Sequence, residues 1–188
     1  MPAPFDLVVR GATLVSSGRR ETADIGVSDG YVVQLGGGMT GRQELAASGL
    51  LALPGGVDAH VHLVYRALAE QIRRTEPIWV DDFWTGSLAA IAGGITTVGN
   101  MTFPMPGESA RAAVAREMEG AGPEAAVDWF LHPVLPDLAA GANGEIAALA
   151  ADGHPSVKIF LTRPQVAADQ PVLTAAVEAA GQAGRRAR

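Results

Sequence analysis

The stretch Pro54-Gly55-Gly56-Val57-Asp58-Ala59-His60-Val61-His62-Leu63 (PGGVDAHVHL) decides the fold of this chain. Before it, short strand-like runs are separated by turns, and after it strand-like and helix-like runs alternate. A Pro-Gly-Gly sequence is typical of a turn between two such regions. We therefore predict a small β-domain at residues 1–53 and an α/β domain at residues 54–188.

The β-domain is predicted from three strand-like segments. Phe5 to Val15 is largely apolar, and Leu50 to Leu53 forms a second, shorter apolar run. Between them, Ala23 to Leu35 (ADIGVSDGYVVQL) has the pattern of a β-hairpin whose turn is Asp29-Gly30.

The α/β domain is predicted to contain four consecutive strand–helix units and therefore a parallel sheet. The expected strands are residues 57–63, 95–101, 126–132 and the run around Lys158, and the expected helices are residues 80–92, 108–120, 143–151 and 170–183. A (β/α)8 barrel needs about 250 residues, so this domain has room for the first four of its units. A doubly wound sheet is the alternative, although no phosphate-binding glycine motif accompanies it.

Composition excludes several classes of protein. The net charge of −6 disfavours non-specific nucleic-acid binding, and the absence of cysteine excludes disulfides and thiolate metal sites. No apolar run reaches the roughly 18 residues of a membrane span, and the start MPAPFDLVVR lacks the features of a signal peptide. We expect a cytoplasmic protein with no nucleic-acid or membrane partner.

The histidine pair is the strongest chemical signal. His60 and His62 are two residues apart on a predicted strand, so both imidazoles face the same side and could ligate one metal ion. A chance pair on the surface is the alternative. Asp58 lies on the same face and could orient a histidine or bond the turn. Asn100 ends the next strand and could contact a substrate or cap a turn.

Lys158 is the only lysine, whereas the other thirteen basic residues are arginines. It lies in the apolar run Ser156-Val157-Lys158-Ile159-Phe160-Leu161. Either cation could extend its charge to solvent from a strand end. Only lysine can lose its proton when buried, and a neutral amine reacts with CO2 to give a carbamate. A carbamate could bridge two metal ions, so Lys158 is a second candidate ligand.

Together, PGGVDAHVHL, DDFWTGSLAAIAGGITTVGNM (81–101) and SVKIFL resemble the hydantoinase and dihydropyrimidinase branch of the cyclic amidohydrolases, whose cousins are allantoinases and dihydroorotases. The resemblance implies a metal-dependent (β/α)8 hydrolase barrel with two divalent ions, usually zinc. It assigns His60 and His62 to the first metal and carboxylated Lys158 to the bridge. A hydroxide ion on the metal would attack the carbonyl of a cyclic amide or ureide. Full-length relatives are homo-oligomers.

Part of the family's site has no counterpart in these residues. The resemblance calls for histidines on the fifth and sixth strands and for a catalytic aspartate on the eighth. We therefore expect the isolated chain to be inactive or poorly folded. A non-catalytic scaffold or a truncated fragment is the alternative to an enzyme.

Three other residues carry open expectations. Arg163 stands where hydantoinases have a substrate-contacting tyrosine, so it could bind an acidic substrate or lie in a solvated loop. His132 could line the cleft or form structural hydrogen bonds. His154 is expected to be solvated.

Overall fold

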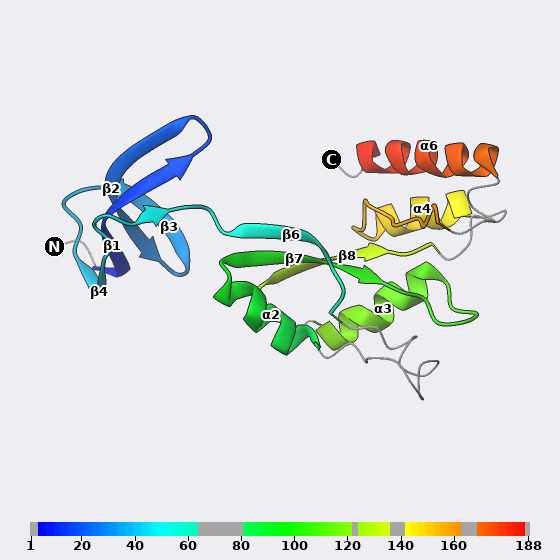
Figure 1. Ribbon diagram of the computed structural model, residues 1–188, viewed down its shortest axis with the longest axis horizontal. Helices are drawn as coiled ribbons and strands as arrows, with labels where there is room; N and C mark the ends of the chain where they lie inside the picture. Colours follow the sequence, from blue (N-terminus) through cyan, green and yellow to red (C-terminus); the bar gives the residue numbers. More distant parts are fainter. Residues whose placement is uncertain (1–3, 64–80, 122–123, 136–141, 163–168, 187–188) are drawn as a thin grey trace. The chain divides into compact units, whose positions relative to one another are not determined.

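The computed structural model describes residues 4–63, 81–121, 124–135, 142–162 and 169–186 (Figure 1). The chain divides into two units, Met1–Gly55 and Gly56–Arg188. The first unit has a mixed parallel and antiparallel sheet of its own, and the second has a parallel sheet with helices.

The first unit is a five-stranded sheet in which β1 is central. Its order is β3-β2-β1-β4. β5 also pairs with β1, along the part of β1 that follows its pairing with β4. The strands are β1 (Phe5–Ser16), β2 (Arg19–Ser28), β3 (Tyr31–Gly36), β4 (Gly41–Ala46) and β5 (Leu51–Ala52). Asp29 and Gly30 connect β2 and β3 with φ values of 51° and 79°. Two positive φ values are typical of a type I′ hairpin turn, so the predicted hairpin is present.

A charged cluster lies on the first unit. The guanidinium group of Arg10 donates to Asp24 Oδ2 at 2.9 Å, to Glu44 and to the carbonyl of Met39 at 2.7 Å. The other oxygen of Asp24 accepts from the N–H of Gly11 at 2.8 Å. These bonds hold the pKa of Asp24 below its usual value, with the Arg10 hydrogen bond as the largest cause. The cluster therefore ties β1 to both of its long neighbours.

The second unit has parallel strands in the order β6-β7-β8, each followed in the chain by a helix. Its elements are β6 (Gly56–Val61), α2 (Phe83–Ala92), β7 (Ile95–Thr102), α3 (Ala110–Ala121), β8 (Asp128–Pro133), α4 (Ala142–Ala151) and α6 (Gln170–Arg186). α3 packs on β7 and β8, and α4 lies beside α6 (Figure 1). The predicted α/β class is confirmed.

Local signals begin and end these helices. Asp82 and Thr85 form a capping box at the start of α2, and Gly94, with a φ of 82°, follows its end. Ser109 accepts from the N–H of Ala112 at the start of α3, and Asp169 does the same for Val172 in α6.

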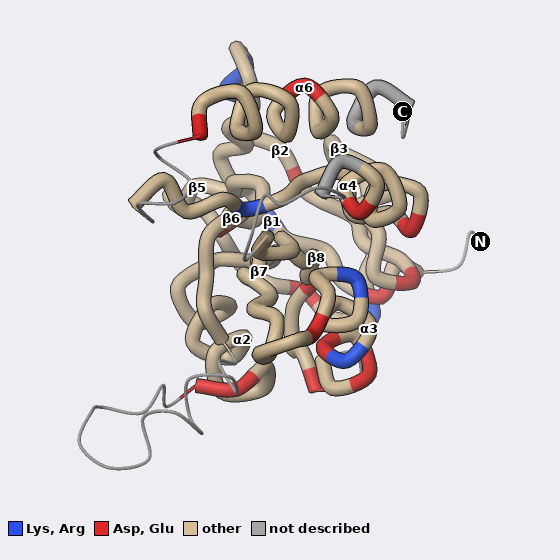
Figure 2. The backbone as a smooth tube through the Cα atoms, turned by 90° about the vertical axis from the view of Figure 1, so that its right-hand side faces the viewer, with Lys and Arg blue, Asp and Glu red and all other residues tan. Residues whose placement is uncertain are grey.

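Both arginines of α3 pair with acidic residues, so its blue segments lie near red ones in Figure 2.

The core of the second unit lies between the sheet and its helices. Val98 and Leu131 of the strands pack with Val114, Ile146 and Leu149 of the helices, and all five are at most 4% exposed. No helix in the described ranges is long and apolar enough to cross a membrane.

The segment around Lys158 differs from the predicted fourth strand. It forms one isolated parallel bridge, between Lys158 and Val134. The N–H of Lys158 donates to Pro133 O at 2.8 Å, and Leu135 N–H donates to Lys158 O at 2.9 Å. Pro155 precedes the segment and a turn begins at Leu161. Lys158 nevertheless lies beside the carboxyl end of β8.

Candidate metal centre

The two imidazoles of the histidine pair stack on each other. The ring centroids of His60 and His62 are 5.3 Å apart and their planes differ by 21°. His60 is exposed at the end of β6, and His62 is half-buried just after it. The side chains therefore project together, as period-two alternation requires.

A β-bulge lies at the histidine pair. Asp58 pairs with Val98 and Val61 with Asn100, so β6 uses one more residue than β7 over this interval. A bulge bends its strand and re-aims a side chain, and bulges are common beside active sites. Asp58 Oδ1 accepts from the N–H of His60 at 3.0 Å. Two roles are predicted for Asp58, orienting a histidine ring and bonding the turn. The hydrogen bond that it forms here is with the backbone.

The backbone after His62 is anchored to the core. Leu63 N–H donates to Asn100 Oδ1 at 2.8 Å, and Asn100 Nδ2 donates to Glu117 of α3. Asn100 is 0% exposed and Glu117 is 6% exposed. The Asn100 amide therefore holds the end of β6 against β7 and α3. Its predicted contact with a substrate stays a prediction, and both of its amide atoms are engaged within the chain.

Two phenylalanine rings connect the histidine pair to the lysine through a series of contacts. The ring of Phe103 lies 5.4 Å from that of His62 and 6.0 Å from that of Phe160. The Nζ atom of Lys158 lies 5.1 Å from the centroid of Phe160. This geometry allows a cation–π contact for the ammonium form of the lysine.

The electrostatics of the centre favour neutral imidazoles. Burial lowers the pKa of His62, and the nearby charges of His60 and Lys158 lower it further. Burial also lowers the pKa of His132, with the same two charges contributing, whereas a backbone hydrogen bond with Ala59 raises it. Neutral imidazole is the form that binds metal ions.

His132 forms a hydrogen bond at the carboxyl end of β8. Its Nδ1 atom lies 2.6 Å from Ser156 Oγ. Sequence reasoning left this role open and missed Ser156, although Ser156 stands two residues before Lys158 and the period-two rule could have found it. It also missed Phe103, for which the apolar β7 run ending at Thr102 gives only a weak signal.

The described residues provide part of a metal site. Within them, no group of three or more histidines, aspartates and glutamates lies close enough to hold a metal ion. The donors near one another are His60 and His62, with the amine of Lys158 acting on His62 electrostatically. Two imidazoles and a lysine able to form a carbamate fit divalent zinc in donor type. Arg163 lies outside the described residues.

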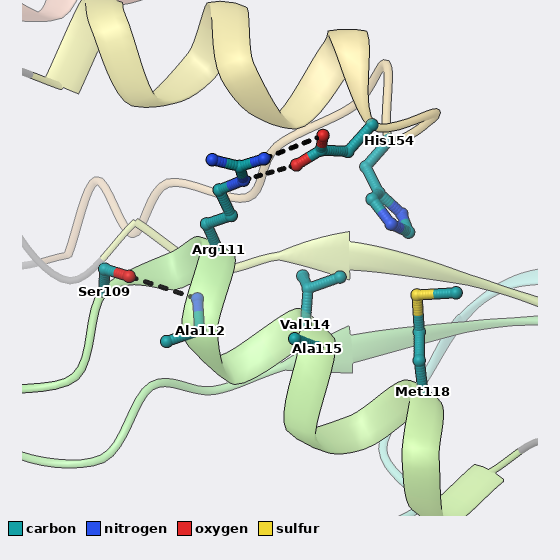
Figure 3. Close-up of a pocket in the computed structure, with 8 residues that line it drawn as sticks. Ser109, Arg111, Ala112, Val114, Ala115, Met118 and His154 are labelled. Atoms are coloured by element: carbon teal, nitrogen blue, oxygen red, sulfur yellow. Dashed lines mark hydrogen bonds and ion pairs between the residues drawn. The ribbon is translucent and has the colours of Figure 1, made fainter.

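A separate hollow of about 580 Å³ lies between α3 and the end of α4 (Figure 3). Met118 and His154 reach toward it, and the Arg111–Asp152 ion pair lies at its side. His154 is half-buried there, whereas the sequence predicts a solvated residue. His60, His62 and Lys158 are not among the lining residues, so this hollow is distinct from the histidine pair.

A known protein family matches the part of the chain that contains the histidine pair and Lys158. The model of the amidohydrolase family matches residues 51–159. A D-hydantoinase from Rhizobium radiobacter is 32% identical over 159 residues, which are 84% of this chain and 33% of the relative. A dihydropyrimidinase from Rattus norvegicus is 32% identical over 163 residues, which are 82% of this chain and 30% of the relative.

A solved structure shows the same similarity. The D-hydantoinase from Bacillus sp. AR9 superposes with a TM-score of 0.79 at 28% identity, over 95% of this chain and 38% of that one. The resemblance predicted from the sequence motifs is therefore confirmed. The chain spans about one third of the length of the curated relatives that it matches.

Proposed function

Because this chain belongs to the amidohydrolase family, we propose that it forms the first part of a hydrolase that opens cyclic amides or ureides at a C–N bond. The stacked pair of His60 and His62, with Lys158 close enough to act on His62 electrostatically, carries the proposal. Hydantoins, dihydropyrimidines, allantoin and dihydroorotate are the substrate candidates, and relatives bearing hydantoinase and dihydropyrimidinase names support this class.

In this proposal His60 and His62 hold one of two divalent ions, most simply zinc. Metal ions at such a site acidify water and polarise the carbonyl under attack. The bulge at Ala59 and His60 aims the first imidazole, and Asn100 fixes the backbone after the second. The lowered pKa of His62 keeps its ring neutral and ready to bind near neutral pH.

Lys158 supplies the anionic ligand after reaction with CO2. The neutral amine attacks the carbon atom of CO2, an N–C bond forms, an electron pair moves to oxygen, and the amine releases one proton to solvent. A cytoplasmic location and a small cyclic amide as substrate belong to the same proposal.

The metal content of the purified chain tests this assignment. We expect the 188-residue chain to retain a divalent ion, and we expect His60→Asn and His62→Asn to lose it. Lys158→Arg keeps a positive charge but cannot form a carbamate. It is expected to lose the carbamate signal seen by 13C NMR under labelled CO2. His154→Asn, at the separate hollow, is the matched control and should change neither.

Ring-opening assays complete the test. We expect no turnover of the four candidate substrates by this chain alone, because the family's remaining ligands and catalytic aspartate have no counterpart in its sequence. Equal metal content in wild type, His60→Asn and His62→Asn would contradict the metal assignment. A carbamate signal that persists in Lys158→Arg would contradict the role of the lysine.

A further inference from the structure

The loop between β7 and α3 is built around one tight turn. Residues 103–108 read FPMPGE, and the two prolines have no backbone N–H to donate. The N–H of Glu108 donates to the carbonyl of Met105 at 2.9 Å, and Gly107 has a φ of 81°. A proline followed by a glycine with positive φ is typical of a type II turn. Because the loop has few backbone donors, it depends on side chains for its other bonds.

Glu108 and Arg116 provide those bonds. Glu108 Oε2 accepts from the N–H of Met105 at 2.7 Å. The guanidinium group of Arg116, on α3, donates from Nε to Glu108 Oε1 and from Nη2 to Glu108 Oε2, both at 3.0 Å. The side chains of Arg116 and Glu108 are 30% and 18% exposed. Two parallel bonds between a guanidinium and a carboxylate fix their orientation as well as their distance, so Arg116 holds the turn against α3.

The same guanidinium group reaches the first residue of the loop. Its Nη2 atom also donates to the carbonyl of Phe103 at 3.1 Å. The carbonyl one residue earlier, that of Thr102, accepts from the N–H of Val134 at 2.9 Å. Bonds on two successive residues thus fix the point at which the chain leaves β7. The ring carried there, that of Phe103, lies 5.4 Å from the ring of His62 between centroids.

We propose that Arg116 is a positioning residue for the candidate metal centre. Its guanidinium group fixes the backbone at Phe103 and the turn at Glu108, and it thereby keeps the Phe103 ring against His62. A ring held there limits the orientations open to the imidazole. The inference rests on the proposed metal site for its chemical consequence, whereas the contact between the two rings is a property of the metal-free chain.

Two methionine variants test this role in the 188-residue chain. Arg116→Met removes the guanidinium group and keeps an unbranched side chain. Arg111→Met is the matched control, because Arg111 also lies on α3 and also donates from Nε and Nη2 to one carboxyl group, that of Asp152. Contact between the Phe103 and His62 rings is measured by NMR in metal-free protein. Zn²⁺ affinity is measured by competition with a chromogenic chelator.

We expect Arg116→Met to lose the signal between the Phe103 and His62 rings and Arg111→Met to keep it. Loss of a group bonded directly to a metal ligand weakens metal binding by about 10- to 100-fold. Arg116 acts through a packed ring, so we expect a smaller loss of about 3- to 10-fold in Zn²⁺ affinity. Arg116→Lys keeps the charge and one bond to Glu108 but not the paired geometry, so it should recover part of both signals.

The outcomes separate the role of Arg116 from the metal site. If wild type binds Zn²⁺ and Arg116→Met binds it equally well, the positioning role is refuted and the metal site stands. If wild type binds no Zn²⁺, the metal site is refuted, and the ring-to-ring signal decides: loss only in Arg116→Met supports the positioning of the ring, and no change, or equal loss in Arg111→Met, overturns it. If Arg116→Met does not fold, Glu108→Gln replaces it and is judged by the same two measurements.

Discussion

Replacing Asn100 by alanine tests the buried contacts that hold the end of β6. Asn100 is 0% exposed, and its amide bonds Leu63 N–H and the carboxyl group of Glu117. Removal leaves one neutral backbone donor without its partner, which costs about 1–3 kcal/mol, and a hydrogen bond to a charged group contributes about 1.5–3 kcal/mol. Allowing for partial relaxation, we expect a loss of about 3 kcal/mol in the free energy of unfolding.

Urea unfolding followed by tryptophan fluorescence measures this loss in the second unit alone. The chain has three tryptophans, and all of them come after Gly56. Thr174→Ala is the control, because this exposed threonine also loses a hydrogen bond, from its hydroxyl to Gln170 O. Exposed substitutions of this kind change stability by about 0.5 kcal/mol or less.

A double-mutant cycle separates the Asn100–Glu117 pair from its surroundings. Asn100→Ala, Glu117→Ala and the double variant should give a coupling energy of about 1–3 kcal/mol, the upper part of the range for residues in contact. A loss below about 1 kcal/mol in Asn100→Ala, with no coupling to Glu117, would refute the account of a buried anchor.

Three further predictions concern close packing and pH. Gly99→Ala places a Cβ 2.7 Å from an aromatic ring of β8, so we expect a loss of about 1–3 kcal/mol in urea unfolding. The pKa values of His62 and His132 lie below 6.5 in the folded state. The unfolded chain therefore binds more protons than the folded chain. With a chelator present to remove metal ions, the urea concentration at the unfolding midpoint should decrease as the pH is lowered from about 7.5 to about 5.5. The pKa of Asp24 is held below 3.8, chiefly by Arg10, so the protection factors of the β1 amides, which correct for the intrinsic exchange rate at each pH, should fall as acid protonates it.

Controls distinguish these effects from general acid damage. The pH-dependent fall in tryptophan-detected stability should shrink when both His62 and His132 are replaced by glutamine, and an unchanged pH profile would contradict the assignment. In the first unit, Arg10→Met should remove the fall in β1 protection factors between neutral and acidic pH. Retention of that fall in Arg10→Met would contradict the role of the ion pair.

Sequence alone determined the features that depend on neighbouring residues. Asp29-Gly30 supplies the positive φ values of its hairpin turn, and the capping box at Asp82 begins a helix. Alternation of strand and helix patterns predicts the α/β class of the second unit. The spacing of His60 and His62 is enough to bring the two rings to one side, where they stack, because alternate residues of a strand face the same side.

Tertiary structure decided the features that depend on partners distant in the chain. The bond of Asn100 spans 37 residues to Leu63, and the bond of His132 spans 24 residues to Ser156. Neither partner belongs to a local motif, so no pattern in the sequence distinguishes a buried anchor from a residue at a cleft. The bridge of the Lys158 segment likewise depends on which backbone groups it meets at the end of β8 and just after it. The sequence thus determines which ligand types are present, and packing between strands determines how they are held.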